Sequence, residues 1–251
     1  GCDRPLLHPA EDAAFVHGHD GFGDAGHAPA MRAAEGEHAA LAILRASREH
    51  AGRLLLVALG PLTNLALALR LDPGLPGRVG RCVVMGGAVT GHGNMTASAE
   101  FNIGYDPEAA AIVFEACPRI ELADWEAVLR HGLPRAGIDR WLAGDDPRQR
   151  FYDAISRGNR AWSLERDPGD WHSADSLAMA LALEPAGALE MVERPLAVET
   201  GHGLARGATI VDWDRQGDRP DNAAILVRYE QARLESLVRR GLGLREVVAA
   251  G

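Results

Sequence analysis

The sequence predicts an α/β fold, an open and mostly parallel sheet with helices on both faces. Short continuous apolar runs, such as 53–59 and 81–85, suit parallel strands that are buried on both sides. Segments with the apolar spacing of helices lie between these runs. Because strand and helix alternate along the chain, the pattern indicates a parallel sheet covered by helices.

Each expected element has its own local signal. The first 28 residues are rich in turn-forming residues, whereas 31–50 is alanine-rich with leucines at helical spacing. Asp106 followed by Pro107 is typical of a helix start and predicts a helix over 106–116. The other expected elements are helices over 65–71, 175–183 and 230–241 and strands over 53–59, 81–85, 119–123, 196–200, 208–212 and 223–229.

We expect a single domain over 1–251, because neither an internal repeat nor a linker divides the chain. The region 125–170 is polar, aromatic and mostly helical in its spacing, and we expect it to cap the sheet edge. The sequence starts at Gly1 without a methionine and without an opening strand. We therefore expect the N-terminal strand unit of the fold to be missing from it.

The composition narrows the classes of partner. A formal net charge of −9 argues against nucleic acid and against an anionic membrane surface, and no apolar run approaches the roughly 18 residues of a membrane span. The charge is compatible with a neutral small-molecule substrate or with bound cations. Three cysteines without a C-x-x-C spacing indicate reduced thiols, and hence a cytoplasmic protein.

The most informative stretch, 83–110, reads VVMGGAVTGHGNMTASAEFNIGYDPEAA. It resembles a phosphate-binding loop only superficially, because His92-Gly93 stands where a Walker A motif requires Lys and Ser or Thr. A dinucleotide fingerprint fails as well, since Thr96 replaces its third glycine. Nucleotide phosphate binding is therefore a poor explanation of these glycines.

The polar residues of this stretch suit a sugar. The carboxylate of Glu100 and the carboxamides of Asn94 and Asn102 follow a buried strand, at the sheet edge where open α/β folds bind ligands. Together they can donate to and accept from several hydroxyls, as a ribose requires. Taken singly, Asn94 is better explained as a turn cap and Glu100 as a solvated side chain.

Several segments together resemble one known family. The chain contains VHGHDGFGD, VALGPLTNLALAL, VVMGG, GN-x5-EFN-x3-DPEAA, ADSLAMALALEP and RGATIVDW in this order. These segments closely resemble the inosine-uridine preferring nucleoside hydrolases over nearly the whole chain. The resemblance implies a Rossmann-like core, hydrolysis of the N-glycosidic bond of ribonucleosides to ribose and free base, and a bound Ca²⁺ ion. It also leads us to expect a homo-oligomer, either a dimer or a tetramer.

The resemblance implies roles for individual residues at the ribose. Asn94 and Glu100 match the residues that hold the 5′-hydroxyl end, and Asn102 matches one that holds the ring hydroxyls. Met85 would pack under the sugar. His17, in VHGHDG, matches a catalytic-pocket histidine near the ribose and base, although a histidine in a glycine-rich loop is otherwise a common solvated turn residue.

The resemblance also implies two calcium ligands. Asp175 matches a late calcium-binding aspartate, and it can equally cap the apolar helix that follows it. The backbone carbonyl of Leu59 would be the second ligand, and a main-chain ligand tolerates a leucine side chain. Calcium suits such a site because it accepts six to eight oxygen ligands in a flexible shell.

Two departures from the family pattern affect the expected activity. Ala174 stands where many members have a histidine that protonates the leaving base, and whether His172 replaces it is open, as is the base preference. The motif D-x-D-P-G-x-D-D, which supplies the main calcium-binding aspartates and the general base, is absent from the sequence. We therefore expect this polypeptide to hydrolyse nucleosides poorly.

Three explanations of that absence stay open. The sequence is a nucleoside hydrolase without its N-terminal part, or a non-catalytic descendant that binds ribosides or acts as an interaction partner. In the third explanation, another chain supplies the missing strand, because an incomplete sheet leaves backbone groups and apolar surface exposed.

Overall fold

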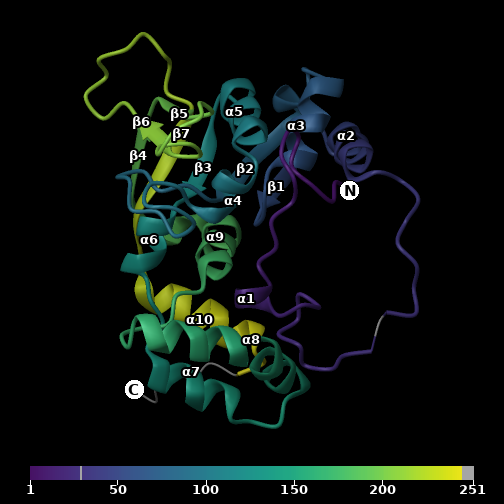
Figure 1. Cartoon of the computed structure of the whole chain (residues 1–251), viewed down its shortest axis with the longest axis vertical. Helices are drawn as coiled ribbons and strands as arrows, with labels where there is room; N and C mark the ends of the chain where they lie inside the picture. The colour runs from purple at the N-terminus through teal and green to yellow at the C-terminus, as the bar shows by residue number, and fades with distance from the viewer. Residues whose placement is uncertain (29, 245–251) are drawn as a thin grey trace.

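The computed structural model describes residues 1–28 and 30–244. Their central feature is a five-stranded sheet with the strand order β1-β2-β3-β7-β4 (Figure 1). The first four strands are parallel to one another, and β4 is antiparallel to β7. The strands of this sheet are β1 (Leu54–Ala58), β2 (Val79–Met85), β3 (Ile120–Ala123), β7 (Ala223–Tyr229) and β4 (Ala188–Arg194).

Helices cover both faces of the sheet, which confirms the predicted fold class. One face packs against α2 (Ala39–Glu49), α3 (Thr63–Leu71) and α5 (Pro107–Ala116), and the other against α6 (Trp125–Arg130) and α9 (Ala174–Leu183). Successive side chains of a strand point to opposite faces, so β2 contributes to two separate cores. Val84 lies in the core with α3 and α5, whereas Val83 and Met85 lie in the core with α9.

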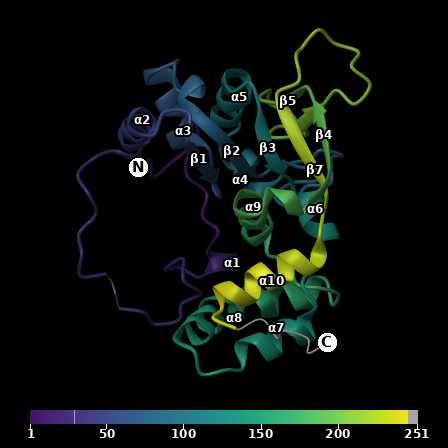
Figure 2. The same cartoon turned by 180° about the vertical axis from the view of Figure 1, so that it is seen from behind.

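A helical layer lies at one end of the sheet, seen from both sides in Figures 1 and 2. It contains α1 (Ala14–His17), α7 (Arg135–Leu142), α8 (Pro147–Arg166) and α10 (Gln231–Gly241). The region expected to be mostly helical therefore contains α6, α7 and α8. None of the helices in the described ranges is long and apolar enough to cross a lipid bilayer.

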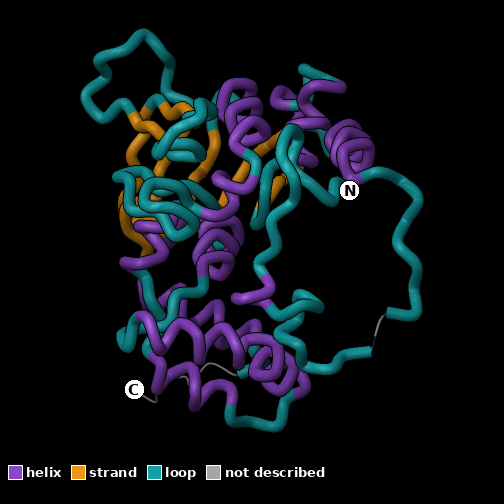
Figure 3. Tube along the Cα trace, viewed as in Figure 1, coloured by secondary structure: helices purple, strands orange, loops and turns teal. Residues whose placement is uncertain are grey.

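Some elements differ from the sequence-based expectation. The helix expected over 31–50 starts only at Ala39, because Gly36 disfavours helix and the His38 side chain accepts a hydrogen bond from the Ala40 amide at the cap. The stretch between α1 and α2 is loop wherever it is described (Figure 3). The strands expected over 196–200 and 208–212 pair only with each other, as β5 (Leu196–Val198) and β6 (Thr209–Val211).

The two edges of the main sheet differ in chemistry. The edge strand β4, which the sequence did not reveal, carries Glu190, Glu193 and Arg194, and such charges discourage pairing with another strand. The opposite edge, β1, reads LLLVA and has a half-buried surface on which Leu55 is 38% exposed. Among the described residues, no strand pairs with the outer side of β1.

Candidate active site

Glu100 closes the loop that leaves β2. Its carboxylate accepts hydrogen bonds from the amides of Asn102 (2.9 Å) and Ile103 (3.2 Å) and thereby caps the short helix α4 (Phe101–Tyr105). The same carboxylate accepts from the Gly87 amide (2.9 Å), at the start of the loop. The side chain is only 2% exposed, and burial raises the pKa of Glu100 to about 7. Glu100 is therefore a buried anchor rather than a solvated side chain.

Asn102 brings three of the predicted residues together. Its Nδ2 atom donates to the Met85 carbonyl (3.2 Å), lies 3.2 Å from the Met85 sulfur, and approaches the Leu59 carbonyl at 3.5 Å. Met85 ends β2, and Leu59 directly follows the neighbouring parallel strand β1. The amide thus spans the carboxyl ends of two strands. Its Oδ1 atom has no hydrogen-bond partner in 1–28 and 30–244, so it is available to a ligand.

Asn94 is exposed, and its side chain makes one hydrogen bond within the described part of the chain. Its Oδ1 atom accepts a hydrogen bond from the Phe101 amide (2.8 Å) at the first turn of α4. The turn-cap interpretation of this residue is therefore correct for the oxygen. The Nδ2 group has no partner within the described part of the chain and can still donate to a hydroxyl.

Asp175 and His17 lie near each other although they are distant in sequence. Asp175 is in the first turn of α9, where its side chain is exposed to solvent. Enough protein nonetheless surrounds the carboxylate that desolvation raises the pKa of Asp175, and His17 at the end of α1 opposes this shift. Asp175 in turn helps to raise the pKa of Glu100. The predicted site residues therefore gather beside the carboxyl ends of β1 and β2.

The donors match calcium in kind but not in number. The Asp175 carboxylate and the Leu59 carbonyl are hard oxygen donors, and desolvation of a carboxylate favours a nearby cation. A calcium shell contains six to eight oxygens, however. No group of three or more His, Cys, Asp or Glu side chains suited to a metal occurs in the described ranges. These two donors alone do not complete a calcium shell.

His172 packs against an aromatic ring outside this group. Its imidazole lies 6.3 Å from the Trp125 ring and 3.9 Å from the Asp167 carboxylate, and its side chain is 12% exposed. Ala174, at the position of the expected histidine, is the first residue of α9. A role for His172 as the leaving-group acid stays a hypothesis.

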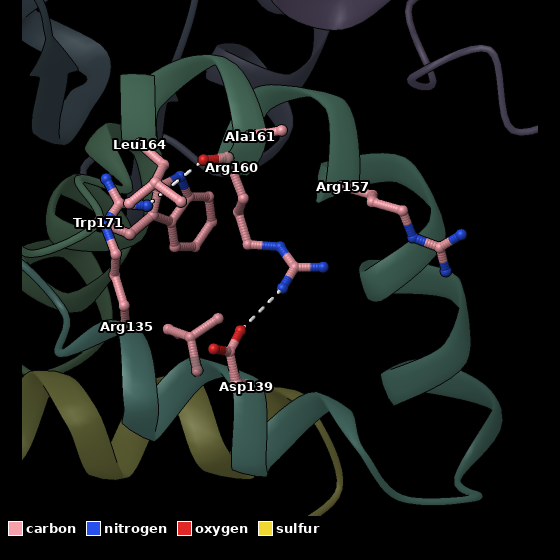
Figure 4. Close-up of a pocket in the computed structure, with 8 residues that line it drawn as sticks. Arg135, Asp139, Arg157, Arg160, Ala161, Leu164 and Trp171 are labelled. Atoms are coloured by element: carbon pink, nitrogen blue, oxygen red, sulfur yellow. Dashed lines mark hydrogen bonds and ion pairs between the residues drawn. The ribbon is translucent and has the colours of Figure 1, made fainter. Parts of the chain in front are cut away.

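A cavity of about 210 Å³ lies elsewhere, between α7 and α8 (Figure 4). Arg135, Asp139, Arg160 and Trp171 line it, and the Arg160 guanidinium bonds the Asp139 carboxylate at 3.4 Å. None of the predicted ribose or calcium residues contributes to its wall. The cavity is therefore distinct from the candidate site at the strand ends.

The sequence did not identify the neighbouring residues that hydrogen-bond the loop after β2. Thr209 accepts a hydrogen bond from the Ala88 amide (2.9 Å), and the Trp213 indole donates to the Val89 carbonyl (3.3 Å). Both residues belong to the segment RGATIVDW, which carries the family resemblance but no predicted role. Asp124, the N-cap of α6, and Glu126, in its first turn, bind the same loop, and the sequence analysis assigned neither of them a role.

Known proteins of one family resemble the chain over nearly its whole length. Residues 1–236 match the family model of the inosine-uridine preferring nucleoside hydrolases. The non-specific ribonucleoside hydrolase RihC of Salmonella paratyphi B is 30% identical over 245 residues, which cover 92% of this chain and 73% of that protein.

Solved structures of nucleoside hydrolases superpose closely on the chain. An inosine-guanosine nucleoside hydrolase matches with a TM-score of 0.88 and 29% identity, covering 98% of this chain and 80% of that one. A purine-preferring ribonucleoside hydrolase from Gardnerella vaginalis matches with a TM-score of 0.87 and 28% identity, covering 97% and 78%. Motif order and whole-chain similarity agree, and the chain belongs to the inosine-uridine preferring nucleoside hydrolase family.

Proposed function

We propose that the residues at the carboxyl ends of β1 and β2 bind the ribose of a ribonucleoside. Family membership makes the protein an N-glycosyl hydrolase that acts on ribonucleosides. The observation that carries the assignment of the site is the position of Asn102, which touches both Met85 and Leu59 and keeps its Oδ1 atom free among the described residues. A free amide oxygen between two strand ends is well placed to accept from a ring hydroxyl.

The remaining ribose contacts follow from the same geometry. Met85, buried against the Asn102 amide, would pack under the sugar. The Nδ2 group of Asn94, which has no partner among the described residues, would donate to the 5′-hydroxyl. Glu100 already accepts three backbone hydrogen bonds, but a carboxylate can accept about four, so one further acceptor position is left for the sugar.

The acidic side chains suit the chemistry of bond cleavage. As the N-glycosidic bond breaks, the ribose becomes an oxocarbenium-like cation, which nearby carboxylates stabilise. Asp175 supplies negative charge, and Glu100 supplies it only above its raised pKa of about 7. His17 is an exposed imidazole close to Asp175. If the Asp175 carboxylate and the Leu59 carbonyl held calcium together with further oxygen ligands, the ion would supply positive charge that polarises water and sugar hydroxyls.

We extend the proposal to the cofactor, the location and the assembly. Calcium is the proposed metal, with nucleoside catabolism and salvage in the cytoplasm as the proposed setting. Cys2, Cys82 and Cys117 are free thiols, which supports a reducing compartment. The apolar outer edge of β1 supports association into a homo-oligomer, because unpaired edge strands tend to pair.

Asp175→Asn is expected to remove calcium-dependent binding of inosine. The amide keeps the size of the side chain but loses its charge, so calcium should no longer improve the dissociation constant, a loss of at least about tenfold. Titration calorimetry with inosine, with and without calcium, measures this, and hydrolysis of inosine, uridine and cytidine is assayed in parallel. The matched control is Asp214→Asn, at an exposed position remote from the strand ends in sequence.

The outcomes separate two functions. Equal inosine affinity in the wild type and in Asp175→Asn would contradict the role assigned to Asp175. Metal-independent binding of inosine without turnover would instead support a non-catalytic riboside-binding protein. The observation that favours this second function is the pair of calcium donors, which is too small a set for a full shell.

A further inference from the structure

Two buried carboxyl groups at the start of α6 lie outside the ribose-binding set. Asp124 is fully buried and Glu126 is 5% exposed. They directly follow β3, whose last residue Ala123 pairs with Met85 at the end of β2. The two carboxyl groups therefore lie beside the loop that leaves β2 and carries Asn94.

Glu126 binds the backbone of that loop. Both of its oxygens lie 2.9 Å from the Thr90 amide, and Oε1 also accepts from the Thr90 hydroxyl (2.6 Å) and from the His92 amide (3.1 Å). One carboxylate thus fixes two amides of the turn, on either side of Gly91, and one side chain. Hydrogen bonds to a buried carboxylate are stronger than those between neutral groups.

Asp124 holds Glu126 in place. Its oxygens accept from the Ala127 amide (3.1 Å) and from the Val89 amide (3.4 Å), and the two carboxyl groups hydrogen-bond each other. Burial, and then the neighbouring Glu126, raise the pKa of Asp124. Burial also acts to raise the pKa of Glu126, but hydrogen bonds from Asp124 and the loop lower it overall. Asp124 therefore fixes the start of α6, the helix that carries Glu126, against the loop.

The position of Asn94 depends on the position of His92, which Glu126 holds. Only Gly93 separates His92 from Asn94, and a Cβ atom on Gly93 would lie 2.4 Å from the carbonyl oxygens of Ala99 and Thr96. The backbone is thus closely packed at Gly93. A shift of the His92 amide would therefore move Asn94.

We infer that Glu126, held by Asp124, is a positioning residue that sets the loop over 88–94 for riboside binding. The inference rests on the proposed ribose site, because Asn94 is the residue that the loop presents to the sugar. Glu126 itself acts through the loop and has no assigned contact with substrate.

Glu126→Gln tests this inference in the full chain. The glutamine amide group places a donor where the Thr90 or His92 donors need an acceptor, so the turn should loosen. We expect amide hydrogen exchange over 88–93 to accelerate about tenfold in ligand-free protein and the dissociation constant of inosine to rise about tenfold. Glu115→Gln, at an exposed position of α5, is the matched control and should change neither quantity.

A second pair of variants guards against misfolding of Glu126→Gln. Thr90→Val removes the hydroxyl donor to Glu126 and keeps the amide donor, so we expect inosine to bind about threefold more weakly. Thr90→Ser restores the hydroxyl and should restore the affinity. A purely structural role would not produce this rescue at unchanged thermal stability.

The outcomes distinguish the two proposals. If the wild type does not bind inosine, the result contradicts both the proposed ribose site and this inference, which rests on it. If the wild type binds inosine and Glu126→Gln binds it equally well, only the inference is overturned. Unchanged hydrogen exchange over 88–93 in Glu126→Gln would also overturn it.

Discussion

Glu100→Ala is expected to destabilise the protein by about 2 kcal/mol at pH 8 and to weaken inosine binding about a hundredfold. The substitution removes the cap of α4 and leaves the buried amides of Gly87, Asn102 and Ile103 without their acceptor. Because Gly87 and Asn102 lie at the two ends of the ribose-binding loop, the loss should reach the site directly. Chemical denaturation and calorimetry with inosine measure the two effects.

The pH dependence of this variant has a defined sign. The pKa of Glu100 is raised from its ordinary value of 4.5 to about 7, chiefly by burial, so the folded state retains a proton that the unfolded chain loses. The stability that Glu100 contributes is full below pH 4.5 and declines as the pH rises to about 7. The destabilisation caused by Glu100→Ala should therefore be larger at pH 5 than at pH 8.

Glu115→Ala is the matched control for charge and size, because Glu115 is an exposed glutamate of α5. We expect it to alter neither the denaturation midpoint nor inosine binding. A Glu100→Ala protein that matched the wild type in stability at pH 5 would contradict the role of Glu100 as a buried anchor.

The strands that the sequence predicted correctly in the main sheet share one property. The segments of β1, β2, β3 and β7 are rich in apolar residues, because helices cover both faces of the sheet there. The edge strand β4 interleaves Glu190 and Glu193 with apolar residues, so its sequence resembles a solvated segment. Its strand conformation depends on pairing with β7, which is a tertiary contact that local propensity does not contain.

The sequence suggested candidate residues for the site but not their contacts. The motif around 94–102 pointed to Asn94, Glu100 and Asn102 as candidate sugar ligands, because their types suit a sugar and the motif resembles the family. It did not reveal that Glu100 is buried or that the Asn94 oxygen caps α4. Glu126 escaped prediction because its partners, Thr90 and His92, belong to a different element that only the sheet order brings close.

Arg81→Ala is expected to destabilise the protein by about 3 kcal/mol at neutral pH. The Arg81 guanidinium bonds both oxygens of the largely buried Glu121 carboxylate, at 3.0 and 2.6 Å. It also donates to the carbonyls of Ala182 (3.0 Å) and Leu181 (3.1 Å), near the end of α9. Removing Arg81 leaves the buried Glu121 carboxylate with only the more exposed Arg119 as an ionic partner. It also removes the two hydrogen bonds to the end of α9, the helix that presents Asp175.

The matched control is Arg119→Ala. Arg119 also bonds Glu121, at 3.3 Å, but its side chain is 52% exposed, so solvent screens the pair. We expect this substitution to cost less than about 1 kcal/mol. Equal losses for Arg81→Ala and Arg119→Ala in chemical denaturation would contradict the importance of the buried contact.

The pH dependence of Arg81→Ala should have the opposite sign to that of Glu100→Ala. Burial acts to raise the pKa of Glu121, but the hydrogen bond and charge of Arg81 lower it below its ordinary value of 4.5. The stability from this pair is present above that value and is lost as the pH falls and Glu121 takes up a proton. The cost of Arg81→Ala should therefore shrink in acid, where the cost of Glu100→Ala grows. Opposite trends in the two denaturation series would separate a carboxylate stabilised by a cation from one that burial alone keeps protonated.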